Sequence, residues 1–348
     1  MPLLFVPATA APDAGPGIAK QTALTIARLD EHLRAEHSSL ADAVAVTVYL
    51  RRAADFAAMN DEYRQAFRGT PPTRTTIVTE PLAVSDDGAL VEMSIVAASS
   101  ERRAVHPSSW MASPNPYSYA IRTGDLLFLS GLLARNGRDN SVINGDVAVQ
   151  TKAVIDNARD LLEAAGLGLS YIVSARVFLT DLADFAEMNR VYREHFPDAP
   201  PARATVGTNL TAPPYKVEMT FIASAGQRRA IDGEGAKNPN LSAAVAAGDL
   251  VFASGMLAPD ASLGDPTAET RAILARLEPV LRAAGSSPSE VRDAIVYGAS
   301  PEAARTAADI CRTTFGHDAA VTAAHVALVT AKATVEIMTI ARRAADSR

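Results

Sequence analysis

The chain has 348 residues, and at about 100–200 residues per domain this length predicts two or three domains with a sizeable core. Hydrophobic residues make up 48% of it, and the net charge of −6 argues against a broad surface for nucleic acid or anionic membrane. The single cysteine, Cys311, excludes an internal disulfide and indicates a reducing compartment.

The chain opens on a short apolar stretch, residues 1–6, that lacks the basic region of a signal peptide. We expect it to be a buried strand. No apolar run in the sequence reaches the roughly 18–20 residues that a membrane span needs. The sequence therefore predicts a cytoplasmic protein.

The sequence then repeats itself, as duplicated units do. The segment that starts at Gln21 matches the one that starts at Gln150, at an offset of 129 and without a gap for more than fifty residues. The matching pairs include Asp55-Phe56 and Asp184-Phe185, Met59-Asn60 and Met188-Asn189, Pro72-Thr73-Arg74 and Pro201-Ala202-Arg203, and Val91-Glu92-Met93 and Val217-Glu218-Met219.

The second copy is complete, so its elements can be predicted in order. We expect strands over 126–130, 172–179, 204–207 and 216–223, the last with Glu218 and Thr220 on one face. We expect a helix over 146–165 that Gly166 ends, and a second helix that Asp184 caps and that runs to about residue 195. Each copy is therefore an α+β unit with a mixed or antiparallel sheet and two helices on one face.

A third, diverged copy follows. Its segment 248–255 repeats 124–131, and Glu336 falls on Glu218. Thr322 stands where Arg203 does, Ala308 where Asn189 does, and Asn240 or Leu241 near the Tyr117 position. The first copy has no counterpart of Tyr117 or Ser130. We predict units over 1–102 (without the opening hairpin), 113–229 and 238–345, joined by linkers near 103–114 and 227–238.

An arginine followed by an isolated glutamate on a strand is the strongest chemical pattern. Arg203 with Glu218 is one such pair, and Arg74 with Glu92 is the second. Arginine presents a planar fork for a carboxylate, and a glutamate beside it can orient or deprotonate water. Taken alone, such pairs on neighbouring strands are more often structural salt bridges.

Three further polar residues are open to two interpretations. Ser130 precedes Gly131 after a strand and is either an exposed site serine or a turn residue. Tyr117 is a packing aromatic on its simplest interpretation. Asn189 is a helix-surface amide unless its recurrence as Asn60 has a functional reason. The histidines form no metal-binding pattern, and glycine-rich nucleotide loops are absent, so the residues support neither a metal site nor a nucleotide-binding loop.

These features together resemble the RidA family, also called YjgF/YER057c/UK114. The resemblance rests on Ser130-Gly131, the helices around Thr151 and Asn189, and the segments of Arg203 and Glu218. It covers almost the whole second copy, the first copy from about residue 18 to 100, and the third weakly.

The resemblance implies chorismate-mutase-like α+β units, three of which surround a central barrel with ligand clefts between units. It implies cofactor-free hydrolysis of reactive enamines and imines. Arg203 would clamp the substrate carboxylate, Glu218 would handle water, and Tyr117, Ser130 and Asn189 would line the cleft; Asn60, Arg74 and Glu92 form a second candidate site. In a single chain the three units would form a pseudo-trimer, so another copy would also wall the cleft at Arg203.

Three functions follow as hypotheses. The first is hydrolytic deamination of an enamine or imine, which a pyridoxal-phosphate or biosynthetic enzyme would supply. The second is a cyclase or tailoring enzyme of secondary metabolism that acts on an unstable amine-containing intermediate, because fusion allows one cleft to specialise. The third is a ligand-binding module without catalysis. In all three the partner is a small molecule, with no nucleic acid and no membrane.

Overall fold

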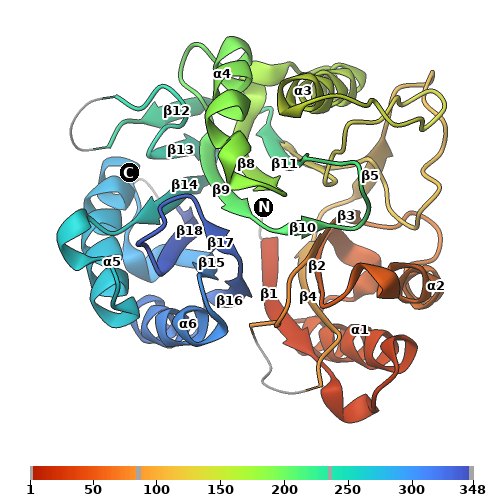
Figure 1. Cartoon of the computed structure of the whole chain (residues 1–348), viewed down its shortest axis with the longest axis horizontal. Coiled ribbons are helices and arrows are strands. Elements are labelled where there is room, and N and C mark those ends of the chain that lie inside the picture. The colour runs from red at the N-terminus through yellow and green to blue at the C-terminus, as the bar shows by residue number, and fades with distance from the viewer. Residues whose placement is uncertain (1–2, 84–87, 234–236, 345–348) are drawn as a thin grey trace.

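The structure, a computed structural model, describes residues 3–83, 88–233 and 237–344. It contains three units of one design, seen in Figure 1 as the red-orange, green and cyan-blue parts of the chain. In each unit a central strand runs parallel to one neighbour and antiparallel to the other. A helix connects the two parallel strands, because parallel neighbours need a crossover.

The first unit begins with a strand, as the apolar start of the chain predicts. Its sheet has the order β1-β4-β2-β3, and β10 of the second unit extends it at the β3 edge. Its elements are β1 (Leu3–Ala10), α1 (Ile18–Ala35), β2 (Ala43–Leu50), α2 (Phe56–Ala66), β3 (Thr73–Val78) and β4 (Val91–Ala98).

The second unit follows the predicted order of elements. Its sheet runs β9-β8-β11-β7-β6-β5, with β17 of the third unit added beside β9. Its elements are β5 (Arg102–Val105), β6 (Ala120–Thr123), β7 (Leu126–Leu129), α3 (Val147–Ala164), β8 (Ile172–Leu179), α4 (Phe185–His195), β9 (Ala202–Gly207), β10 (Asn209–Leu210) and β11 (Val217–Ser224).

The third unit repeats this plan with the sheet order β12-β13-β14-β18-β15-β16. Its elements are β12 (Arg228–Ile231), β13 (Ala244–Ala247), β14 (Leu250–Leu257), α5 (Pro266–Ala283), β15 (Val291–Gly298), α6 (Pro301–Phe315), β16 (Ala320–His325), β17 (Ala327–Leu328) and β18 (Val335–Arg342).

Two local features differ from the sequence analysis. The segments expected as linkers contain β5 and β12, which pair with β6 and β13 at the start of the following unit's sheet. Asp184 stands at the N-cap of α4, but its side chain makes no capping bond, because its backbone is already near helical at φ −76° and ψ −7°. Asp181 instead accepts a bond of 2.9 Å from the amide of Ala183 in the preceding turn.

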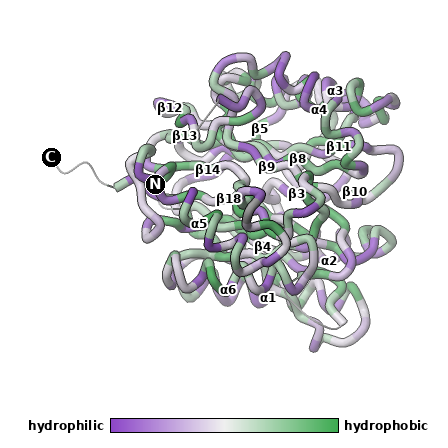
Figure 2. Tube along the Cα trace, turned by 60° about the vertical axis from the view of Figure 1, so that its left-hand side comes forward, coloured by the Kyte–Doolittle hydropathy of each residue, from purple (hydrophilic) through white to green (hydrophobic). Residues whose placement is uncertain are grey.

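The helices lie on the outside of the molecule and the strands toward its centre (Figure 1). Each pair of helices covers its own apolar core, and two further cores contain residues from all three units. Hydrophobic and hydrophilic segments alternate along the outer helices α1 and α6 (Figure 2), as in helices with one buried face. A central cavity of about 80 Å³ is also lined by all three units.

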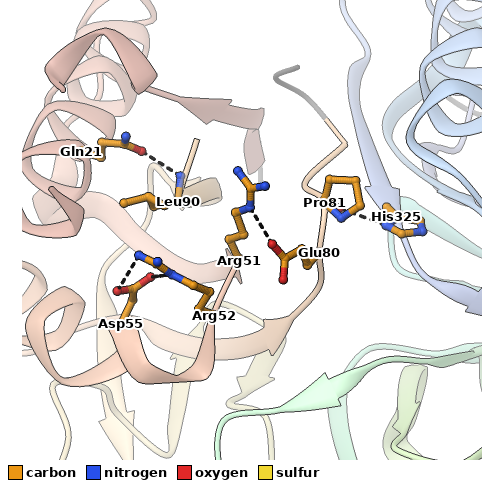
Figure 3. A network of polar contacts seen from close by, with 8 residues as sticks. All are labelled: Gln21, Arg51, Arg52, Asp55, Glu80, Pro81, Leu90 and His325. Atoms are coloured by element: carbon orange, nitrogen blue, oxygen red, sulfur yellow. Dashed lines mark hydrogen bonds and ion pairs between the residues drawn. The ribbon is translucent and has the colours of Figure 1, made fainter. Parts of the chain in front are cut away.

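The units contact one another in a cycle. Strand β10 of the second unit pairs with β3 of the first, and β17 of the third pairs with β9 of the second. Between the first and third units, the Thr79 hydroxyl donates to the carbonyl of His325 at 2.6 Å. The His325 ring also contacts the carbonyl of Pro81 at 2.9 Å, next to the Arg51–Glu80 ion pair (Figure 3).

Candidate active site

The structure does not bring Arg203 and Glu218 into one site. Arg203 of β9 pairs with Ala175 of β8, and Glu218 of β11 pairs with Phe178 of the same strand β8. Those partners are three residues apart, and successive side chains of a strand point to opposite faces of the sheet. Arg203 therefore faces the helices of its own unit, whereas Glu218 faces the neighbouring first unit.

Each glutamate instead meets the arginine of the preceding unit. We call the contact between the first and second units interface I, that between the second and third interface II, and that between the third and first interface III. Interface I combines residues Asn60, Arg74, Tyr117, Ser130 and Glu218. Interface II combines residues Asn189, Arg203, Ser254, Gly255 and Glu336. The predicted site residues are thus divided among the three interfaces, because Glu92 lies at interface III.

Interface I is held together through the backbone of Arg74. The Ser130 hydroxyl accepts a hydrogen bond of 2.9 Å from the Arg74 amide and donates one of 2.7 Å to the carbonyl of Ser118. The Gly131 amide donates to the Arg74 carbonyl at 3.0 Å. Ser130, predicted to line a cleft, is therefore fully buried and fixes the strand that carries the arginine.

The guanidinium of Arg74 lies among aromatic rings. Its central carbon is 4.8 Å from the ring centre of Tyr63 and 5.5 Å from those of Phe56 and Tyr117. Its Nη1 has no hydrogen-bond partner although it is buried. The amide of Asn60 donates to Asn115 at 3.3 Å. Cation–π contacts hold the charge in place and leave N–H groups available for an anion.

Interface II repeats this arrangement between the second unit, which supplies the arginine, and the third unit, which supplies the serine. The Arg203 amide donates to the Ser254 hydroxyl at 2.8 Å, and that hydroxyl donates to the Ser242 carbonyl at 2.6 Å. The Arg203 side chain lies 4.5 Å from the ring centre of Tyr192 and donates from Nη2 to Asn189 at 2.6 Å. Its Nε and Nη1 are buried without a partner.

Arg203 and Glu336 line one cavity of about 400 Å³. They form no direct ion pair in the part of the chain that the structure describes, and Oε2 of Glu336 is buried without a hydrogen-bond partner. Buried polar atoms without partners are rare in folded proteins. Unpartnered donors of Arg203 and an unpartnered acceptor of Glu336 therefore belong to side chains that line the buried end of one cavity.

A glycine beside each glutamate makes room for its carboxylate. A Cβ added at Gly131 would stand 1.8 Å from Oε1 of Glu218, and one added at Gly255 would stand 1.9 Å from Oε1 of Glu336. Any larger residue at these positions would displace the carboxylate. The sequence signal for this role was the Ser-Gly pair that follows the strand in both copies.

Burial raises the pKa of both glutamates to about 8. A backbone hydrogen bond from Thr76 and the charges of Arg176 and Arg74 oppose this shift for Glu218, and the charge of Arg203 opposes it for Glu336. Desolvation disfavours the charged form of a carboxyl group, so both are largely protonated at neutral pH. A carboxyl group with such a pKa can both donate and accept a proton near pH 7.

Interface III keeps a glutamate, Glu92, but has lost the arginine, and here the sequence alignment was wrong by one residue. Val321 pairs with Ala294 on β15, as Arg203 pairs with Ala175 on β8, so Val321 and not Thr322 takes the arginine position. The reason is that the segment between the aligned phenylalanine and the strand is one residue shorter in the third copy, 316–319 before β16 against 197–201 before β9.

The first unit contributes no serine or glycine to interface III. Thr9 pairs with Met93 as Leu132 pairs with Met219, so β1 takes the place of the strand that ends at Ser130. Pro7 and Ala8 thereby stand in the positions of Ser130 and Gly131. Glu92, a predicted site residue, is buried on β4, where it pairs with Tyr49 and Ala10; it holds the position at interface III that Glu218 holds at interface I.

Sequence reasoning missed the aromatic residues that hold the arginines, Tyr63 and Tyr192. It also left Ser254 and Glu336 outside the proposed site. The signal was available, because the repeat places Tyr63 on Tyr192 and Glu336 on Glu218. The described residues hold no cluster of three His, Cys, Asp or Glu side chains that could bind a metal, and none of their helices is both long and apolar enough to span a membrane.

Comparison with known proteins gives the class of this chain. The sequence profile of the Ribonuc_L-PSP family, described as "Endoribonuclease L-PSP", matches it three times, over residues 9–99, 108–225 and 235–343. The chain therefore belongs to this family, which is the RidA family of the sequence analysis, and carries three copies of its unit.

Individual relatives each correspond to about one unit. A RutC family protein of Sulfurisphaera tokodaii is 41% identical over 32% of this chain and 89% of its own length. Protein DfrA of Myxococcus xanthus is 40% identical over 35% of this chain and 95% of its own. The chloroplastic Reactive Intermediate Deaminase A of Arabidopsis thaliana is 33% identical over 38% of this chain and 71% of its own.

Proposed function

We propose that the chain catalyses cofactor-free hydrolysis of a reactive enamine or imine that carries a carboxylate, at interfaces I and II. The observation that carries this proposal is geometric. At both interfaces an arginine with an unpartnered N–H group lies near a buried glutamate of the next unit, and at interface II the two side chains line one cavity. A relative named for the deamination of reactive intermediates supports the same class of reaction.

The arginine binds the substrate carboxylate. At interface II the Nε and Nη1 atoms of Arg203 have no hydrogen-bond partner, and either can act with the second N–H of Nη2 as a fork that matches the two oxygens of a carboxylate. Asn189 accepts a hydrogen bond from Nη2 of Arg203, and the ring of Tyr192 lies against the face of the guanidinium. The arginine is therefore oriented before the substrate arrives, which lowers the entropic cost of binding.

The glutamic acid moves the protons. Protonated Glu336 donates its proton to the enamine carbon, or to the nitrogen of the imine. The resulting carboxylate takes a proton from the water that adds to the C=N carbon. Glu336 returns that proton to the amine nitrogen of the adduct and, as the C–N bond breaks, takes the proton of the adduct's hydroxyl group. The products are ammonia and a 2-oxo acid, and Glu336 is protonated again. A pKa near 8 allows both directions of transfer at neutral pH.

The test measures ammonia and 2-oxo acid release from 2-imino acids generated by an amino-acid oxidase. Each interface is isolated by removing the other arginine, Arg74→Ala for interface II and Arg203→Ala for interface I. We expect Glu336→Gln to abolish the activity in the Arg74→Ala background and Glu218→Gln to abolish it in the Arg203→Ala background. The double variant Arg74→Ala/Arg203→Ala should have no activity.

Glu92→Gln is the matched control, because Glu92 is a buried glutamate on the corresponding strand at interface III. It should keep the wild-type rate. If a folded wild-type protein accelerates no imine, the proposal is wrong. Saturable binding of 2-oxo acids without turnover would then favour the ligand-binding hypothesis.

A further inference from the structure

Interfaces I and II differ at two positions that face the arginine. In interface I, Ser130 donates to the carbonyl of Ser118, which lies between Tyr117 and Tyr119. In interface II the corresponding bond runs from Ser254 to Ser242, which lies between Leu241 and Ala243. Leu241 therefore takes the place of Tyr117, and Ala243 takes the place of Tyr119.

The exchange changes the space beside the arginine. At interface I, Tyr117 stands against Arg74, and the rings of Tyr117 and Tyr119 meet edge to face with centres 5.9 Å apart. Trp110 meets Tyr119 in the same way at 5.1 Å. The cavity at this aromatic cluster measures about 30 Å³, and neither Arg74 nor Glu218 lines it, so the tyrosines separate it from the arginine. With leucine and alanine in place of the tyrosines, the cavity at interface II measures about 400 Å³.

The walls of the larger cavity are divided by polarity. Arg203, Ser254 and Glu336 lie at its buried end. Its apolar wall consists of residues Phe185, Leu241, Ala243, Met256, Leu257, Val280 and Val329. Of the remaining polar side chains, Thr205 is also buried, whereas Asp232, Asn238 and Arg276 are exposed and so lie at the rim.

From this division we infer that interface II is built for 2-imino acids, or their enamine forms, with a bulky apolar side chain, aromatic or branched. The inference rests on the proposed function for the reacting end of the substrate. Arg203 holds the carboxylate, and the side chain extends from the reacting carbon along the apolar wall. The volume lies in the range of about 300–1,000 Å³ that is typical of pockets for whole small molecules. Leu241 and Ala243 determine the specificity by leaving this space open.

The test compares 2-imino acids derived from alanine, leucine and phenylalanine in the Arg74→Ala background, where only interface II can act. We expect kcat/KM for the two larger substrates to exceed that for the alanine-derived one by about tenfold or more, the scale on which apolar pockets discriminate. Leu241→Tyr should lower kcat/KM for the two larger substrates by at least this factor relative to the alanine-derived one, because it fills the space that their side chains occupy.

Ala243→Leu provides a second, smaller filling of the same space in case Leu241→Tyr does not fold. The reciprocal variant, Tyr117→Leu in the Arg203→Ala background, should raise the rate on the larger substrates at interface I. The inference is overturned if the three substrates react equally at interface II. It is also overturned if both filling variants slow all substrates by the same factor.

A binding measurement distinguishes a failure of the substrate specificity from a failure of the proposed function. The unreactive 2-oxo acids of the same three side chains can be titrated calorimetrically into the Arg74→Ala protein. If no imine is hydrolysed but the larger 2-oxo acids bind about tenfold more tightly than pyruvate, and Leu241→Tyr abolishes that preference, the proposed function fails and the specificity stands. If imines are hydrolysed without any preference in rate or binding, the specificity fails and the proposed function stands.

Discussion

Interfaces II and III are built from equivalent strands and helices of the repeated unit. Of these two, only interface II retains the full set of site groups. Interface II carries Arg203, Ser254 and Glu336 around an open cavity. At interface III the first two positions hold Val321 and Pro7, and only the glutamate, Glu92, remains. Three identical subunits would have three identical interfaces, whereas three units in one chain can diverge separately.

The comparison also shows what the fold itself requires. At interface II the Ser254 hydroxyl satisfies the backbone amide of Arg203. At interface III the Thr322 hydroxyl satisfies the amide of Ala8 at 3.0 Å, so the hydroxyl and the amide have changed sides. Buried backbone donors must find partners, and interface III still provides one. Interface III has therefore kept its packing and backbone hydrogen bonding, although it lost the arginine and the serine of the site.

The largest effect should come from returning an arginine to interface III. Val321 is 3% exposed in the core beneath the helices of the third unit. Val321→Arg places a charge there with no aromatic cradle like that of Arg203, and an uncompensated buried charge costs about 3–5 kcal/mol. Urea unfolding should show this loss, and Val321→Met should lose less than about 1.5 kcal/mol. A stable variant with a third active interface would show that loss of the arginine alone separates III from II.

The second effect concerns pH and the glutamates. The pKa of Glu336 is about 8 in the folded chain and 4.5 as an ordinary value. Between these values the unfolded state has released a proton that the folded state keeps, so wild-type stability falls as the pH rises from 4.5 to 8. Glu336→Gln should therefore gain on the order of a few kcal/mol over wild type at pH 9 and almost nothing near pH 4.

Denaturant unfolding at the two pH values measures this difference directly. Glu218→Gln should show the same pattern, since burial raises its pKa in the same way. Equal stability of variant and wild type at pH 9 would contradict the protonated state on which the proposed mechanism depends.

The third prediction concerns the rate of a variant at Gly255, the glycine position that is an alanine at interface III. Gly255→Ala brings a methyl group against the Glu336 carboxylate, and Ala8 is the natural residue at the same position of interface III. A misplacement of about 1 Å typically costs about 100-fold in rate, so we expect a loss of that size in the Arg74→Ala background. Gly168→Ala is the matched control, because a Cβ there meets nothing within 4 Å. Equal rates for the two variants would show that the position of the carboxylate is not limiting.

The smallest effect should come from Ser254→Ala. This change leaves the Arg203 amide and the Ser242 carbonyl without their common partner, at a cost of about 1–3 kcal/mol. Thermal unfolding checks it, with the exposed Ser289→Ala as control. An unchanged midpoint would mean that interface II does not need its serine for stability, just as interface III is stable with Pro7 at that position.

The sequence by itself determined the units, the elements of the second copy and the chemical types of the site residues. The repeat identified these features because local patterns of period 2 and 3.6 and recurring residues need no tertiary information. It also predicted that the third copy lacks an arginine, although a loop one residue shorter moved the position from Thr322 to Val321.

Only the tertiary structure decided which arginine meets which glutamate. Arg203 and Glu218 belong to one sheet, but the alternation of side chains along β8 sends them to opposite faces. Each then meets a partner from a different unit, and a linear alignment contains no such pairing. The space at interface II was equally beyond the sequence, because it depends on Leu241 and Ala243 facing an arginine that belongs to another unit.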